Sequence, residues 1–402
     1  MCIIVVKVKT LINQNLLTMK KFNYLLIAFL FVASILQSCK KEDELKTDEN
    51  TSIIPTSFKV DIPASISSSS SKKALKAGGD TLQGNEIYSN LRTFIAIGEN
   101  GAQFVQNIMT AIQVYNINKA IALSYTDGQD NRQKNLVVLE NVTFASVSYQ
   151  YMLTISDAAS IDSLDKGVGL QVMWNTSPVE GIAIIKPKNT NRNDAFGSEH
   201  PNVMIQIHYS ETKSNGYDAE MTVSINGLTM PVNPVNDQIY AISELKMFAG
   251  RKDDIIEVRG SSNHPLAKFT SDSSAASGFN WAFVAAGYKE NVNDEIAVVE
   301  LGLPPSGLNS TVRDTLLGNY SLQNVFFREI KKVYPWATDE VIMGYLKNAD
   351  APGYFNKSGF VQSKNAPTGT YNSLYESLRS KVNSMTPYNP KDIDDLSIVF
   401  KP

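Results

Sequence analysis

Cysteine is nearly absent from this chain. Its two cysteines, Cys2 and Cys39, both lie in the first 39 of 402 residues, so the rest can form neither a disulfide nor a cysteine-based zinc site. A hydrophobic core alone must stabilise that remainder, and roughly 320 residues are enough to build one. The charges nearly balance, with 37 basic and 40 acidic residues and a net charge of −3, which disfavours binding driven by nucleic-acid phosphates.

Histidine is also scarce, and the chain has only His200, His208 and His264. None of them falls in a His-Glu-x-x-His or comparable metal-binding spacing. We therefore expect solvated or locally hydrogen-bonded histidines, and no metal ion.

Catalytic and cofactor motifs are incomplete. Gly167-Val168-Gly169 begins a dinucleotide-like pattern, but Val172 stands where the third glycine belongs. Residues 127–131, Asp-Gly-Gln-Asp-Asn, could place oxygens around calcium, but they lack the alternating acids and the final glutamate of an EF-hand loop and are typical of a polar turn. We predict no cofactor and no enzyme activity, although a glycoside hydrolase needs only two correctly spaced carboxylates and so remains open.

The first 39 residues have the layout of a secretory signal. Lys20 and Lys21 precede an apolar run over residues 24–35, which is too short for the roughly 20 residues that span a bilayer. Residues 1–18 are expected to lie upstream of a start at Met19, with Met1 as the alternative start.

The end of this signal, Leu36-Gln37-Ser38-Cys39, resembles the lipobox of bacterial lipoproteins. The resemblance implies cleavage before Cys39 and acylation of its thiol, which would anchor the protein in a membrane. A signal peptide without lipidation, or a short buried helix, is the alternative.

Residues 40–44, Lys-Lys-Glu-Asp-Glu, resemble the leader that sends lipoproteins of Bacteroidetes-type bacteria to the cell exterior. The chain after Cys39 has 33 basic against 40 acidic residues, a net charge of −7. We expect an outer-membrane lipoprotein that faces the exterior. A charged linker on the periplasmic side is the alternative.

A tether is predicted over residues 40–83, since this segment has little periodicity and contains a serine run at 67–71. Alternation over residues 58–62 indicates a short strand by which part of the tether can dock. The remaining residues 84–402 are expected to form one body.

Helices are predicted at both ends of the body. Apolar residues indicate one over residues 99–115, preceded by a helix over 87–95 that breaks around residues 98–101. After residue 304, helices are predicted over 322–333, 338–348 and 372–384, followed by a short strand at 396–400. Residues 311–402 would thus be a mainly helical cap.

Strands dominate residues 136–303, where apolar and polar residues alternate. A hairpin joins residues 203–212 to 217–225 near Asn215-Gly216, a dipeptide typical of tight turns. Further strands are predicted over 147–155, 170–174, 181–186, 239–248, 255–259, 279–286 and 295–301. The fold class is therefore α+β, with an antiparallel sheet folded as a sandwich or as a strongly curved half-barrel.

Exposed aromatic side chains are the candidate ligand contacts. Trp174 and Trp281 share strand faces with apolar residues and are expected in the core. Trp336 and Tyr334 lie between two predicted helices, where the rings can stay exposed and contact a ligand, although packing on the cap is the favoured alternative.

Three triplets resemble the Asp-Ser/Thr-aliphatic sequon that Bacteroidetes-type bacteria O-glycosylate on exported proteins. They centre on Thr81, Ser163 and Thr315. The resemblance implies that these three hydroxyl groups carry glycans.

Taken together, the lipobox, charged leader and serine-rich segment resemble uncharacterised surface lipoproteins of Bacteroidetes-type bacteria. Blocks such as residues 181–187, 246–250 and 351–355 share that likeness, which implies an anchor but no activity. We expect a binding or scaffold lipoprotein, with the outer membrane and a glycan or protein as partners and no nucleic acid. Two alternatives are a carrier of hydrophobic ligands or lipoproteins and a polysaccharide-processing enzyme.

Overall fold

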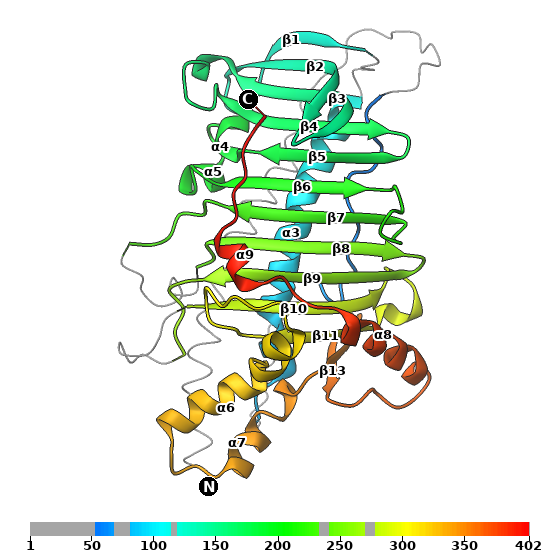
Figure 1. Cartoon of the computed structure of the whole chain (residues 1–402), viewed down its shortest axis with the longest axis vertical. Coiled ribbons are helices and arrows are strands. Elements are labelled where there is room, and N and C mark those ends of the chain that lie inside the picture. Colours follow the sequence, from blue (N-terminus) through cyan, green and yellow to red (C-terminus); the bar gives the residue numbers. More distant parts are fainter. Residues whose placement is uncertain (1–52, 68–80, 114–118, 233–240, 270–277, 402) are drawn as a thin grey trace. The chain divides into compact units, whose positions relative to one another are not determined.

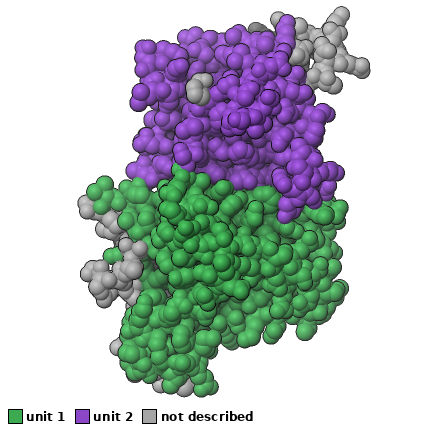
Figure 2. Space-filling model, viewed as in Figure 1, with its two compact units in different colours: residues 1–23, 61–98, 230–396 green, residues 24–60, 99–229, 397–402 purple. Residues whose placement is uncertain are grey.

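A computed structural model describes residues 53–67, 81–113, 119–232, 241–269 and 278–401 (Figure 1). The leader, Cys39 and the segment at 40–44 lie outside these residues. The chain forms two compact units, where the sequence predicted one body (Figure 2). Unit 1 comprises the described residues of 61–98 and 230–396, and unit 2 those of 53–60, 99–229 and 397–401.

Unit 2 holds the first strands, each antiparallel to the next along the chain. They are β1 (Ile121–Thr126), β2 (Gln133–Phe144), β3 (Val147–Asp157), β4 (Val168–Thr176), β5 (Val179–Ile185), β6 (Met204–Ser210) and β7 (Ala219–Asn226). The predicted hairpin is confirmed as β6 and β7, but both strands are shorter than predicted, and residues 211–218 connect them. β1 was not predicted.

Unit 1 holds the later strands, again antiparallel and in chain order. They are β8 (Glu244–Lys252), β9 (Ile255–His264), β10 (Phe279–Tyr288), β11 (Ala297–Gly302), β12 (Gly353–Asn356) and β13 (Gly359–Ser363). The last two occupy a stretch where the sequence indicated no strand. All strands belong to one open antiparallel sheet, so the α+β class is confirmed and the single-sheet arrangement replaces the sandwich.

One continuous helix, α3 (Gly84–Gln113), replaces the two helices that the sequence predicted. Glycine inside a helix costs about 1 kcal/mol relative to alanine, which is why a break was expected. Tertiary packing offsets this cost. A Cβ on Gly98 would lie 2.6 Å from the Cε of Met247, and a Cβ on Gly101 would lie 3.5 Å from the Cγ2 of Ile205. Gly98 thus lets the helix approach β8 more closely than a side chain would allow, whereas the separation at Gly101 is an ordinary van der Waals contact that does not require glycine.

The remaining helices are shorter than α3 and lie in the segments after β5, β11 and β13. Unit 2 contains α4 (Pro187–Thr190) and α5 (Ala195–Glu199); unit 1 contains the π-helix η6 (Asp314–Asn319), α6 (Leu322–Val333), α7 (Asp339–Tyr345), α8 (Asn372–Ser384) and α9 (Pro390–Asp394). The Thr338 hydroxyl accepts a hydrogen bond from the Val341 amide and caps α7, as predicted. In the described part of the chain, none of the helices combines the length and apolar character needed to span a bilayer.

Residues 53–67 correct the predicted tether. Phe58, Val60 and Ile62 are 0%, 2% and 7% exposed, so this segment belongs to the folded units. Alternating apolar side chains bury enough surface here to offset the entropy of ordering the segment. Ile54, 15 residues after Cys39, is only 3% exposed. At no more than about 3.6 Å per residue, the chain from Cys39 to Ile54 spans at most about 54 Å.

The predicted strand at residues 396–400 is not a strand. This extended segment packs instead on unit 2, where Ile398 joins a hydrophobic cluster with Met173 and Ile184. Gln171 holds the end of the segment, because its Oε1 accepts from the Lys401 amide at 2.7 Å and its Nε2 donates to the Lys401 carbonyl at 3.2 Å. Side-chain bonds thus take the place of a strand ladder.

Candidate functional site

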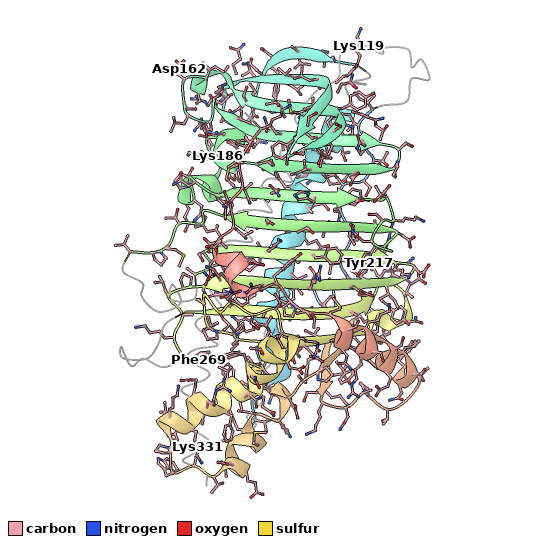
Figure 3. All side chains as sticks on the ribbon, viewed as in Figure 1. Lys119, Asp162, Lys186, Tyr217, Phe269 and Lys331 are labelled. Carbon is pink, nitrogen blue, oxygen red and sulfur yellow. The ribbon has the colours of Figure 1, made fainter. Side chains whose placement is uncertain are left out.

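The predicted ligand contacts lie at the tip between α6 and α7. Trp336 is 58% exposed, and its ring stands edge-on to Tyr334 with centroids 5.9 Å apart. Lys331, labelled in Figure 3, holds the tip by donating hydrogen bonds to the Ala337 carbonyl and the Asp339 carboxylate, both at 2.7 Å. The other two tryptophans are in the core as predicted, with Trp174 at 0% and Trp281 at 2% exposure.

The other predicted positions lie apart from one another. The Ser163 hydroxyl lies within hydrogen-bond distance of the Ser160 carbonyl and the Asp165 carboxylate in a tight loop. Thr315 lies in η6, and Thr81 immediately precedes buried Leu82. The histidines also differ. His208 is exposed, His200 is 6% exposed, and His264 is fully buried with its Nε2 2.9 Å from the Ser262 hydroxyl.

A buried ion cluster in unit 2 was not predicted. Asp157, at the end of β3, is fully buried. Its carboxylate accepts two hydrogen bonds from Arg132, at 2.5 and 2.7 Å, and one from Lys134 at 3.1 Å. The Arg132 hydrogen bonds, followed by those of Lys134, hold the pKa of Asp157 well below its usual range.

Further bonds tie this cluster to the loops around it. Lys134 also donates to Asp130 at 2.8 Å and to the Asn189 carbonyl at 3.4 Å. Asp165 binds Lys186 at 2.6 Å, and Lys186 is labelled in Figure 3. In the described residues, no group of three acids, histidines or cysteines is arranged to hold a metal ion. The cluster therefore fixes loops and strand ends, and its carboxylates are already occupied.

The alternation of two strands contains the signal for this cluster. In β2, Lys134 occupies the same face as buried Leu136 and Val138. In β3, Asp157 follows Leu153 and Ile155 on one face. Two opposite charges at inward positions of paired strands indicate a buried ion pair, because an unpaired buried charge is very costly.

A second group lies in unit 1, where two cations form no ion pair with any described residue. We call Lys246, Phe248, Arg259 and Tyr388 the cation-aromatic site. Phe248 of β8 lies opposite Arg259 of β9, and Lys246 lies two residues earlier on the same face. The ammonium of Lys246 is 4.6 Å from the centroid of the Tyr388 ring, and the guanidinium of Arg259 is 5.4 Å from it. The guanidinium is also 5.1 Å from the Phe248 ring centroid.

Among the described residues, neither cation of this site has a charged partner. Within the part of the chain that the structure describes, Lys246 and Arg259 form no ion pair within 4.0 Å, and the buried Nε of Arg259 has no hydrogen-bond partner. Two of the carboxylates on this face are engaged in other ion pairs. Glu257 accepts from Lys381 at 3.0 Å, and Glu300 pairs with Arg313. Two half-buried cations beside one ring thus retain their capacity to bind an anion.

Two carboxyl groups lie next to this site. Glu244 is two residues before Lys246 on the same face, and Asp394 of α9 accepts a hydrogen bond from Asn263 at 2.5 Å. Burial, more than any other influence, raises the pKa of both carboxyl groups, and the negative charge of Asp394 raises the pKa of Glu244 further. An anion is therefore expected at the Arg259 side of the site, away from these acids.

Comparisons with protein-family models, with curated proteins and with solved structures found no match to this chain.

Proposed function

We propose that this chain is a lipid-anchored binding lipoprotein of the outer membrane that faces the cell exterior. The signal-like leader and the lipobox ending in Cys39 support the anchor. The charged residues 40–44 support the exterior location.

The observation that carries the binding function is that, among the described residues, the two cations of the cation-aromatic site contact aromatic rings but no carboxylate. Every folded chain must offset the cost of partly burying a charge, and most do so with a carboxylate or a hydrogen bond. Here Arg259 is positioned between two rings, while Lys246 faces the same Tyr388 ring. We infer that the ligand carries a carboxylate, phosphate or sulfate group, because the planar fork of arginine fits these oxyanions.

Titration of the protein with glucuronate and with inorganic phosphate, followed by calorimetry, tests this binding. Arg259→Gln and Lys246→Gln are each expected to weaken binding of the better probe about tenfold or more, since a charge-assisted hydrogen bond contributes about 1.5 to 3 kcal/mol. Arg251→Gln is the matched control, because Arg251 lies on β8 with Lys246 and is exposed. Equal affinities for Arg259→Gln and Arg251→Gln, or no saturable binding by the wild type, would contradict the proposal.

Palmitate labelling tests the anchor separately. Wild-type protein in a lipoprotein-processing host is expected to incorporate labelled palmitate and to sediment with the membrane fraction, whereas Cys39→Ser should lose both properties. Each buried methylene of an acyl chain contributes about 0.8 kcal/mol, so loss of the chains should release the protein. Unchanged membrane partitioning of Cys39→Ser would remove the basis for the proposed location. If the body is protected from protease added to intact cells, it lies on the periplasmic side.

The contacts of α3 favour binding at the cation-aromatic site over the carrier alternative. A carrier would need room between α3 and the strands, and Met247 and Ile205 contact that helix directly. The polysaccharide-processing alternative draws on Glu244 and Asp394, the carboxyl groups with raised pKa values beside the site. A binding role is favoured over both, because it uses the two cations that form no ion pair within the described part of the chain.

A further inference from the structure

The edge strand β1 has the features of a pairing surface. Among the described strands, β1 pairs with β2 alone and so lies at one edge of the sheet. Along this strand, Leu123 is half-buried and the other residues are exposed. Its sequence, Ile-Ala-Leu-Ser-Tyr-Thr, contains no charge and no proline. Natural edge strands usually carry a charged residue or a proline, because an unprotected edge offers free backbone groups to another chain.

The edge strand at the other end of the strand order, β13, is covered by other residues. On β13, the amide of Phe360 donates to the Asn85 side chain at 3.0 Å, and the Phe360 ring stacks on Tyr88 with centroids 5.7 Å apart. Both partners belong to α3, which covers this strand. The described residues provide no comparable cover for β1, whose Ile121 is 37% exposed.

The apolar side of β1 continues a buried row. Ile121 lies opposite Val138 and Leu123 opposite Leu136, and directly opposed residues project on the same face of a sheet. Val138 and Leu136 are 1% and 5% exposed. The hydrophobic face therefore extends to the edge strand, where it stops without a neighbouring strand.

One register lets β1 pair with itself. If a twofold axis passes through Leu123, antiparallel pairing places Leu123 opposite Leu123 of the second copy, and Ile121 opposite its Tyr125. Ala122 then pairs with Ser124. All three apolar side chains stay on one face, so each forms a cross-strand apolar contact.

The same register matches the charges at both ends of the strand. Lys119, labelled in Figure 3, and Asp127 flank β1 and lie an equal number of residues from Leu123. Self-pairing therefore places Lys119 of each copy opposite Asp127 of the other. Among the described residues neither side chain has an ion-pair partner within 4.0 Å, although Asp127 accepts a hydrogen bond from the Gln129 amide at 3.0 Å. The charges thus select the register that the apolar residues favour.

We propose that two copies of this chain associate through their β1 strands, antiparallel and with Leu123 on the twofold axis. The dimer joins two sheets edge to edge, so one assembly carries two copies of the proposed binding site, each on β8 and β9 and thus well away from the pairing edge in the strand order. Two linked sites can engage a repetitive ligand with an avidity well above the affinity of one site. The association itself does not depend on the proposed ligand.

Disulfide trapping in cells tests the proposal on the full-length chain. Oxidation of Leu123→Cys is expected to give a reducible species of twice the chain mass, since directly opposed residues of paired strands have Cα separations compatible with a disulfide. Val147→Cys is the matched control, because Val147 is 44% exposed on another strand of unit 2. The wild type, which retains Cys2 and Cys39, controls for crosslinks through these residues.

Charge reversal provides the second test. Adding Lys119→Asp to the Leu123→Cys chain should lower the trapped yield about fivefold, as expected when surface ion pairs are lost, and adding Asp127→Lys should restore it. The proposal is overturned if the Leu123→Cys chain resists protease as well as the wild type does, and is therefore folded, but yields only monomer after oxidation. A crosslinked product with the mass of a different protein also overturns it. If Leu123→Cys fails to fold, the double variant Ala122→Cys and Ser124→Cys traps the same register.

Discussion

Replacing Asp157 with alanine is expected to lower the free energy of unfolding by about 3 to 5 kcal/mol, the cost of removing one partner of a buried ion pair. The side chain of Lys134 is 1% exposed and would lose the carboxylate 3.1 Å away. Arg132 would lose both of its bonds to Asp157. Urea denaturation followed by circular dichroism measures the change. Asp162→Ala is the control, because Asp162 lies in the loop after β3 and is exposed (Figure 3). Equal costs for the two variants would contradict a stabilising cluster.

Acid should reveal the same cluster. In the unfolded chain an aspartate has a pKa of about 3.9, whereas hydrogen bonds from Arg132 and Lys134 hold the folded pKa of Asp157 below its usual range. The stabilisation is fully present above the unfolded pKa and is lost as the pH falls toward the folded one, because the unfolded state then binds more protons. Wild-type stability is therefore expected to fall below about pH 4, and Asp157→Ala to show a shallower fall. Parallel pH profiles for the two chains would contradict this assignment.

Phe58→Ala is expected to destabilise the protein by about 3 to 5 kcal/mol, as for other buried phenylalanines. The ring is fully buried in unit 2 and lies 5.4 Å from the Tyr209 ring centroid. Gly181 leaves room for it, since a Cβ there would lie 2.8 Å from the Cζ of Phe58. Limited proteolysis and thermal unfolding measure the loss.

Thr56→Ala is the matched control for Phe58→Ala, because Thr56 is an exposed side chain of the same segment. It should change stability by no more than about 0.5 kcal/mol. If the Phe58→Ala chain is as stable as the wild type, this segment does not contribute to the folded core, and the original prediction of a tether holds for it.

The segment around Phe58 also shows what composition can and cannot predict. Residues 40–83 look like a tether when averaged, yet Phe58, Val60 and Ile62 alternate and become buried. The alternation was visible in the sequence. Whether it leads to docking depends on the partner surface, where Gln106 accepts from the Phe58 amide and the Met221 sulfur accepts from the Val60 amide. These contacts join residues far apart in the chain, so local pattern cannot establish them.

The cation-aromatic site could not be predicted for a similar reason. The sequence predicted β8 and β9, and their pairing places Lys246 and Arg259 on one face. Tyr388 follows α8 and comes from a distant part of the chain. The predicted aromatic contact, Trp336, was identified because a connection between two helices is a local feature. A site assembled from two strands and a remote loop has no such local signal.

The sequence by itself determined the strands with clear alternation, the helices with apolar stripes, and the antiparallel α+β class, because periodicity follows from backbone geometry. It did not determine the edges. β1, β12 and β13 lack strong alternation, and they are strands because a neighbouring strand offers them backbone partners. Tertiary structure also decided which charges are paired and which are left without a partner. Pairing depends on separations of a few ångströms between side chains that are distant along the chain, and this information exists only once the chain has folded.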